Sequence, residues 1–153
     1  DPEQRVLSQI ENFCPYHERF DNLLSAGGVM SRKDALFDGP VVLFKDKPNY
    51  KMPGGDGCKA HQDVQAGWGR YAPLHITMLV SIDDATPASG CLGLAAGLHR
   101  QGLLGRHWKP LEEDSDITCT SCPTKRGDAV FLILLSFIVR VRISPIVPGA
   151  SFM

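Results

Sequence analysis

The segment from Leu74 to Ile82 constrains the fold more than any other part of the chain. Apolar side chains occupy every second position, which places them on one face of an extended strand. The members of this face are Leu74, Ile76, Met78, Val80 and Ile82. The opposite face is less apolar and consists of His75, Thr77, Leu79 and Ser81. Turn-forming residues from Asp83 to Pro87 end the segment, so the sequence predicts a strand here.

Shorter segments before and after it favour further strands. They are residues 41–44, 91–95 and 129–132, separated by loops rich in the chain's 15 Gly and 11 Pro. Residues 3–26 show helical spacing of apolar side chains, with a break at Cys14-Pro15 and a stop at Gly27-Gly28. Several short strands after a helical lead predict a mainly β fold, a sandwich or jelly roll with N-terminal helices. A parallel α/β fold would need helices between the strands.

Charge and hydropathy exclude several classes of protein. Among 153 residues, 16 Lys and Arg balance 17 Asp and Glu. This balance argues against nucleic-acid binding driven by basic charge and against disorder. The apolar run from Ala129 to Val139 is shorter than the roughly 20 residues of a membrane-spanning helix, and no signal peptide is visible. We expect an intracellular, cytoplasmic protein without a membrane partner; peroxisome, mitochondrion and oligomeric state stay open.

The five cysteines do not suggest a disulfide framework, because their number is odd and their spacing irregular. Reduced thiols in an intracellular protein are the simplest interpretation. Cys119 and Cys122 form a lone CxxC pair without further ligands at zinc-binding spacing. A zinc or redox module built on this pair is the weakest of the functional hypotheses.

The motif that carries chemistry is His61-Gln62-Asp63. Residues i and i+2 of an extended segment share a face, so His61 and Asp63 present an imidazole and a carboxylate together. With one distant His, such a pair forms the facial triad that holds Fe(II) and leaves positions open for a cosubstrate and O2. Taken alone, the three-residue motif also occurs without a metal.

Several spaced motifs resemble the phytanoyl-CoA dioxygenase-like family of Fe(II)- and 2-oxoglutarate-dependent oxygenases. They cover roughly residues 30–131 and are most similar to the branch that includes 2-aminoethylphosphonate dioxygenases. The matching segments are 44–55, 61–68, 71–75, 82–86, 90–92, 97–99 and 123–128. The resemblance implies a double-stranded β-helix, a relative of the jelly roll and cupin folds. It also implies Fe(II), 2-oxoglutarate as cosubstrate, O2, and hydroxylation of a small-molecule substrate.

The resemblance implies that His61 and Asp63 are metal ligands. Thr77 is a candidate for holding the cosubstrate or orienting a metal ligand, although it is also a common strand residue. Lys45, Tyr50, Lys51 and Trp68 are candidates for binding the substrate; a solvated basic turn and ordinary packing are the alternatives. Gln62 is a candidate for orienting the ligands.

The C-terminal part departs from the family pattern. The third ligand, a His, should fall at Ile138, and the Arg that pairs with 2-oxoglutarate is missing where Pro148-Gly149-Ala150 stands. A one-base slip after Phe131 would turn an expected Ser-Pro-Arg-Arg-Ile segment into Val147-Pro148-Gly149-Ala150-Ser151. We therefore expect a partial dioxygenase domain at 1–131 and an out-of-pattern tail at 132–153, from a frameshift or an alternative exon.

The same departure affects the expected activity. The chain starts at Asp1 without Met, and we interpret it as a fragment whose jelly roll is incomplete at the C-terminus. Two protein ligands hold iron less well than three, so we expect weak or no turnover. The alternative is a non-catalytic jelly-roll binding domain that has lost the third iron ligand.

Overall fold

A computed structural model describes residues 7–26, 36–37, 39–54, 57–109, 111 and 117–140, without the side chains of residues 25, 26 and 140. The chain divides into two compact units, one ending at Asn49 and the other beginning at Tyr50. In the part that the structure describes, no helix is long and apolar enough to cross a membrane.

The first unit contains the helical segments. A 3-10 turn at Cys14–Tyr16 is followed by helix α1 (Glu18–Asp21) and a π-helical turn at Asn22–Ala26. The buried carboxylate of Asp46 accepts hydrogen bonds from the backbone N–H groups of Phe13 (2.8 Å) and Cys14 (3.1 Å). The N–H groups at the start of a helical turn are not used by the helix itself, so these two bonds make Asp46 a cap for the helical segment.

Two predictions for this unit need correction. Residues 7–12 contain no helix, and Gln9 forms an isolated bridge with Asn49 instead. Pro15 lies inside the first turn, where its fixed φ suits a helical start, and does not break a helix. Residues 3–6 and Gly27-Gly28 lie outside the described residues.

The predicted strand at residues 41–44 is wrong. Among the described residues, this segment belongs to neither sheet, and Val42 is 89% exposed. Strand propensity reflects packing on a half-buried sheet surface, and a segment without that surface does not form a ladder.

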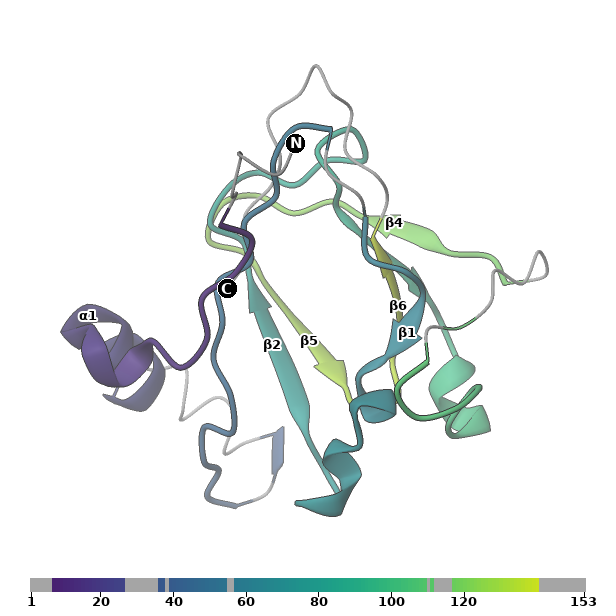
Figure 1. The fold of residues 1–153 in the computed structure, drawn as a ribbon, viewed down its shortest axis with the longest axis horizontal. Coiled ribbons are helices and arrows are strands. Elements are labelled where there is room, and N and C mark those ends of the chain that lie inside the picture. Colours follow the sequence, from purple (N-terminus) through teal and green to yellow (C-terminus); the bar gives the residue numbers. More distant parts are fainter. Residues whose placement is uncertain are drawn as a thin grey trace. The chain divides into compact units, whose positions relative to one another are not determined.

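The second unit consists of two antiparallel sheets (Figure 1). Four strands form one sheet in the order β1-β6-β3-β4: β1 (His61–Gln62), β6 (Phe137–Arg140), β3 (Leu92–Ala95) and β4 (Thr120–Cys122). The second sheet pairs β2 (Ile76–Val80) with β5 (Ala129–Ile133). The short turn at residues 134–136 carries the chain from β5 into β6 and thus from one sheet to the other.

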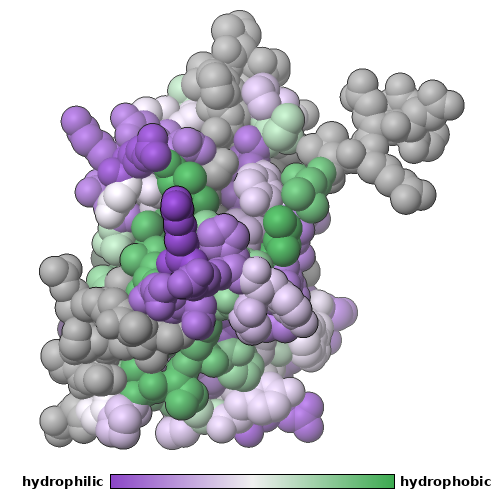
Figure 2. All heavy atoms as spheres, turned by 90° about the vertical axis from the view of Figure 1, so that its left-hand side faces the viewer, coloured by the Kyte–Doolittle hydropathy of each residue, from purple (hydrophilic) through white to green (hydrophobic). Residues whose placement is uncertain are grey.

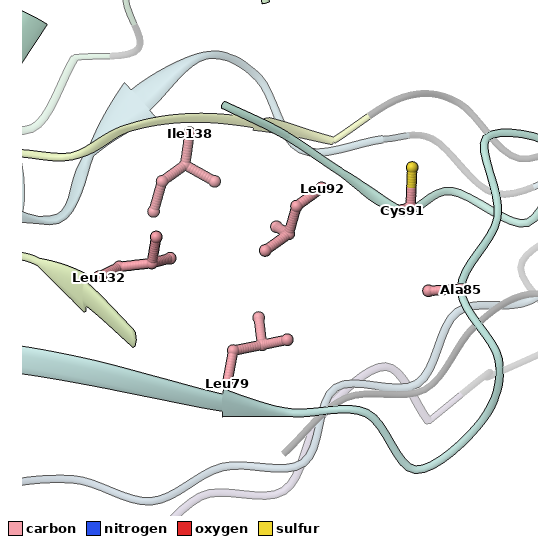
Figure 3. Packing of buried hydrophobic residues seen from close by; sticks show 6 residues of the cluster. All are labelled: Leu79, Ala85, Cys91, Leu92, Leu132 and Ile138. Atoms are coloured by element: carbon pink, nitrogen blue, oxygen red, sulfur yellow. The ribbon is translucent and has the colours of Figure 1, made fainter. Parts of the chain in front are cut away.

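The core of this unit lies between the two sheets. Leu79 and Leu132 come from β2 and β5, while Leu92 and Ile138 come from β3 and β6, and their side chains point toward one another (Figure 3). Cys91 and Ala85 complete the cluster and are fully buried. The mainly β fold predicted from the sequence, with helical segments before the sheets, is therefore confirmed.

The strand predicted at residues 74–82 is confirmed as β2, but the face that it buries is not the more apolar one. The less apolar face points into the core, since Leu79 and Ser81 are buried while Ile76, Met78 and Val80 are only half-buried. The strands predicted at 91–95 and 129–132 are β3 and β5.

Part of the predicted out-of-pattern tail takes part in the sheets. Residues 132–133 complete β5, and residues 137–140 form β6 between β1 and β3. Residues 141–153, which include the segment Val147–Ser151, lie outside the described residues. Apolar side chains also reach the surface, as green patches between polar residues on the face drawn in Figure 2. Among the described residues, the side chains of Val42, Tyr71 and Trp108 are strongly exposed.

Candidate metal centre

The two residues of the His-x-Asp motif lie where β1 passes into a 3-10 turn. His61 is the first residue of β1, and Asp63 begins the turn Asp63–Ala66. We call residues 61–66 the metal loop. Gln62 in between is 1% exposed, whereas His61 and Asp63 are half-buried. His61 Nε2 and Asp63 Oδ1 lie 3.7 Å apart. Both side chains therefore present a polar atom to the same small region, as the alternation of an extended segment requires.

The local contacts of His61 select the tautomer that a metal ligand needs. Its Nδ1 lies 2.8 Å from the carbonyl oxygen of Lys59. A carbonyl only accepts hydrogen bonds, so Nδ1 carries the proton and the neutral ring leaves the lone pair of Nε2 available.

Cys58 adds a second contact to the same nitrogen, with its Sγ 3.7 Å from Nδ1. This contact is the main reason that the pKa of His61 is raised above its ordinary value. The Lys59 carbonyl and the Asp63 carboxylate act in the same direction, and burial of the ring opposes them. Cys58 was not among the residues singled out from the sequence; its position three residues before His61 was the available signal.

Asp63 is held in a similar way by β2. Thr77 donates a hydrogen bond from Oγ1 to Asp63 Oδ2 at 2.7 Å, which leaves Oδ1 as the oxygen nearest to His61. One polar atom of each ligand is thus used for orientation and the other is left to bind. The structure places Thr77 against the carboxylate of a candidate ligand, which is the orienting one of its two predicted roles.

The position opposite His61 is filled by a hydrocarbon side chain. β1 and β6 pair so that His61 stands across from Ile138. Partners across an antiparallel pair share a face, with Cβ atoms about 5 Å apart. Ile138 is 5% exposed and packs in the core cluster. The family pattern expects the third ligand at this position. Ile138 is therefore adjacent to His61 but provides no donor atom.

These residues match a metal site only in part. Among the described residues, no group of three or more His, Cys, Asp or Glu side chains is placed to hold a metal ion. An imidazole nitrogen and a carboxylate oxygen are suitable donors for Fe(II), yet a facial triad needs one more. The described residues provide a two-donor site.

The predicted substrate-binding residues are divided between the two units. Lys45 belongs to the first unit, where its Nζ forms an ion pair with Glu11 Oε1 at 2.8 Å. Lys51 donates to the Gly90 carbonyl, next to the start of β3. Trp68 is half-buried in a 3-10 turn directly after the metal loop, and its carbonyl accepts a hydrogen bond from His75 Nε2 at 3.1 Å. Tyr50 is half-buried.

The CxxC pair has the wrong geometry for a shared metal or a disulfide. Cys122 ends β4 and Cys119 directly precedes that strand. Three residues of extended chain separate the two Cα atoms by about 10 Å, beyond the reach of a disulfide. The extended backbone therefore argues against the zinc or redox module.

The fold and the loop define a jelly-roll domain with a His-x-Asp motif where its first strand ends, and solved structures share this fold. EctD from S. alaskensis in its apoform superimposes with a TM-score of 0.78 at 17% identity, over 99% of this chain and 57% of that one. AviO1 from Streptomyces viridochromogenes Tue57 gives a TM-score of 0.72 at 19% identity, over 98% and 66%.

The chain belongs to the phytanoyl-CoA dioxygenase family, because the model of the family "Phytanoyl-CoA dioxygenase (PhyH)" matches residues 8–133. It is 36% identical over 118 residues to a 2-aminoethylphosphonate dioxygenase of uncultured bacterium HF130_AEPn_1, covering 77% of this chain and 42% of that protein. It is 39% identical over 97 residues to a methylphosphonate hydroxylase of Gimesia maris, covering 63% and 36%. The chain thus spans less than half the length of either relative.

Proposed function

We propose that this chain carries the metal loop of an Fe(II)- and 2-oxoglutarate-dependent dioxygenase for a small molecule, and that it binds the metal weakly and turns over little or not at all. His61 and Asp63 are its metal ligands, and Thr77 orients Asp63. When bound, iron together with 2-oxoglutarate and O2 supplies the oxidising chemistry of such enzymes.

A single observation carries this proposal: His61 Nε2 and Asp63 Oδ1 lie 3.7 Å apart, while the other polar atom of each side chain is already occupied by Lys59 or Thr77. Second contacts of this kind are characteristic of metal ligands, because they fix the tautomer and the ring orientation. An ordinary surface His–Asp contact does not need them.

The low activity follows from Ile138. A hydrocarbon side chain replaces the donor expected across from His61, so the metal has fewer protein bonds to hold it. For the substrate we propose a small polar compound such as a phosphonate, because both relatives are named for phosphonates. Tyr50, Lys51 and Trp68, which belong to the second unit, are the candidates for contacting it.

The test is to supply the missing donor. In Ile138→His the new imidazole stands across from His61, and we expect the Kd for Co(II), used as a spectroscopic probe for Fe(II), to fall at least tenfold. Metal should also raise the Tm of this variant more than that of the wild type, since a ligand that binds only the folded state stabilises it. Both effects should disappear when His61→Ala is added.

Leu92→His is the matched control. Leu92 is buried in the same cluster as Ile138 but stands across from Cys122 and Arg140 rather than from His61. The variant introduces the same cost of a buried imidazole without a position across from His61. Equal Co(II) affinity of the two variants, or robust succinate formation by the wild-type chain with Fe(II) and 2-oxoglutarate, would contradict the proposal.

The second candidate is a non-catalytic jelly-roll domain that binds its ligand without a metal. The observation that favours it is the apolar side chain of Ile138 at the ligand position. Calorimetry distinguishes the two: a metal-free chain that binds 2-aminoethylphosphonate with unchanged affinity in His61→Ala supports this candidate. Binding that depends on added metal supports the dioxygenase.

A further inference from the structure

Two buried glutamines lie on the side of the metal loop away from the candidate ligands. Gln62 is 1% exposed and Gln65 is 4% exposed, which is unusual for an uncharged polar side chain of this size. Each must make hydrogen bonds to offset the loss of water. Their hydrogen-bond partners link the metal loop to two other segments of the second unit.

Gln62 uses both ends of its amide group. Its Nε2 donates to the carbonyl oxygens of Gly102 (3.1 Å) and Leu135 (2.7 Å), and its Oε1 accepts from the N–H of Leu104 (2.7 Å). Leu135 lies in the turn that leads into β6 and hence to Ile138. One side chain thus ties the metal loop to both the 102–104 segment and the β5–β6 turn.

Gln65 extends the attachment along the same segment. Its Oε1 accepts from the Gln62 N–H at 2.8 Å, and its Nε2 donates to the carbonyl oxygens of Arg106 and Lys109. Its own carbonyl accepts from the Trp108 N–H at 2.8 Å. We call residues 102–109 the belt: it contains no helix or strand, and Trp108 in it is 77% exposed at a positive φ of 61°.

The need for this attachment follows from the shortness of β1. A strand of two residues makes few ladder hydrogen bonds and does not fix its own orientation well. Gln62 stands between His61 and Asp63 in sequence, and its side chain points to the opposite face. A rotation of Gln62 about the strand would therefore displace the imidazole and the carboxylate together.

We infer that Gln62 and Gln65 are positioning residues: by docking the belt and the β5–β6 turn onto the metal loop, they hold His61 and Asp63 in the orientation that a metal needs. The inference deepens the proposed function and rests on it for the identity of the ligands. The belt thus helps to set the geometry of the candidate metal site, although neither candidate ligand belongs to it.

The first experiment needs no metal. In ¹⁵N spectra of the imidazoles at a pH where the rings are neutral, we expect wild-type His61 to be largely the Nδ1–H tautomer. Gln62→Met, which keeps the length of the side chain and removes its hydrogen bonds, should give a mixture of tautomers. Ser81→Ala is the control, because Ser81 is also 1% exposed but its hydroxyl pairs with Thr124 rather than with the metal loop or the belt.

A wild-type His61 spectrum in folded Gln62→Met would overturn the inference, as would an equal change in Ser81→Ala. If Gln62→Met does not fold, Gln65→Met decides by the same measurement, because it removes the bonds to Arg106, Lys109 and the Gln62 N–H but leaves the Gln62 side chain and its own three bonds present. An unchanged His61 spectrum in that variant also overturns the inference.

The second experiment uses Co(II) and separates the inference from the proposed function. We expect Gln62→Met to raise the Kd for Co(II) by roughly 10- to 100-fold, the range known for groups that orient metal ligands, and Ser81→Ala to leave it within about twofold. If the tautomer changes as expected but the wild type shows no Co(II) binding that depends on His61, the proposed function fails and the positioning role stands. If the wild type binds Co(II) and both Gln62→Met and Ser81→Ala bind it with the wild-type Kd, the positioning role fails.

Discussion

Thr77 shows how much of the site depends on a single hydroxyl. It donates to Asp63 Oδ2 from the strand opposite the metal loop. We predict that Thr77→Val weakens Co(II) binding by roughly 10- to 100-fold, because the carboxylate loses the group that orients it. The loss of one hydrogen bond should lower the stability of the fold by only about 1 kcal/mol.

Titration with Co(II) followed by its visible absorption measures this effect. Thr77→Ser keeps the hydroxyl and should bind Co(II) nearly as well as the wild type. A Thr77→Val chain with wild-type affinity would show that Asp63 is oriented by other contacts.

His61 gives a prediction about pH. Its pKa is raised, chiefly by Cys58, so the folded chain favours the protonated ring more than the unfolded chain does. The stability that this contributes is fully present below the unfolded pKa of about 6.5 and is lost as the pH rises through the folded value. Cys58→Ala should lower the pKa of His61 toward its ordinary value and reduce this contribution.

The measurement is an NMR titration of the His61 ring, with Cys119→Ala as a control because Cys119 lies next to β4 and is not one of the groups that shift the pKa of His61. If Cys58→Ala leaves the His61 titration where it is in the wild type, the thiol is not the cause of the shift.

At the scale of elements, the sequence could predict strands that have an apolar side chain at every second position over several residues. The β2 segment has that pattern, and β3 and β5 follow turns. β1 and β4 are too short to have a period, with two and three residues. The segment 41–44 has the composition of a strand, but pairing depends on a partner that local sequence does not reveal.

The site was predictable to a similar extent. His61 and Asp63 stand out because their residue types and spacing are those of metal ligands. The belt and the Gln65 contacts could not be found this way, since they join residues about forty positions apart through backbone carbonyls of any residue type. The only local signal was the pair of glutamines three residues apart, which form a capping box on the turn Asp63–Ala66.

Strand β6 gives the prediction at this scale, because it lies in the segment that departs from the family pattern. It pairs with β3 so that Gly93 stands across from Val139, and a Cβ at Gly93 would lie 2.7 Å from Val139 Cγ1. Gly93→Ala should therefore cost about 1–3 kcal/mol, the usual cost of overpacking. Urea denaturation measures it.

Gly69→Ala is the matched control, since a Cβ there meets nothing within 4 Å. It should be close to neutral. A neutral Gly93→Ala would mean that residues 137–140 do not pack on β3 in solution, which would favour the interpretation of this segment as a tail outside the fold.

At the scale of the second unit, one core serves both sheets. Leu92 from the four-stranded sheet and Leu79 and Leu132 from the two-stranded sheet belong to the same cluster (Figure 3). Among the described residues, this is the one buried apolar cluster that stabilises either sheet. The two sheets should therefore unfold together rather than one after the other.

Leu92→Ala tests this cooperativity. Leu92 is 2% exposed, so the truncation should cost about 2–5 kcal/mol, and the surface change Leu103→Ala, at a residue 37% exposed, should cost far less. Hydrogen exchange measured at β2 and β5 as well as at β3 and β6 should show that protection falls by the same factor in both sheets, because opening either one exposes the shared core. Loss of protection confined to β3 and its neighbours would mean that the two-stranded sheet is held by other contacts. The metal loop would then be supported by only one of the two sheets, since β1 belongs to the four-stranded sheet and Thr77 to the other.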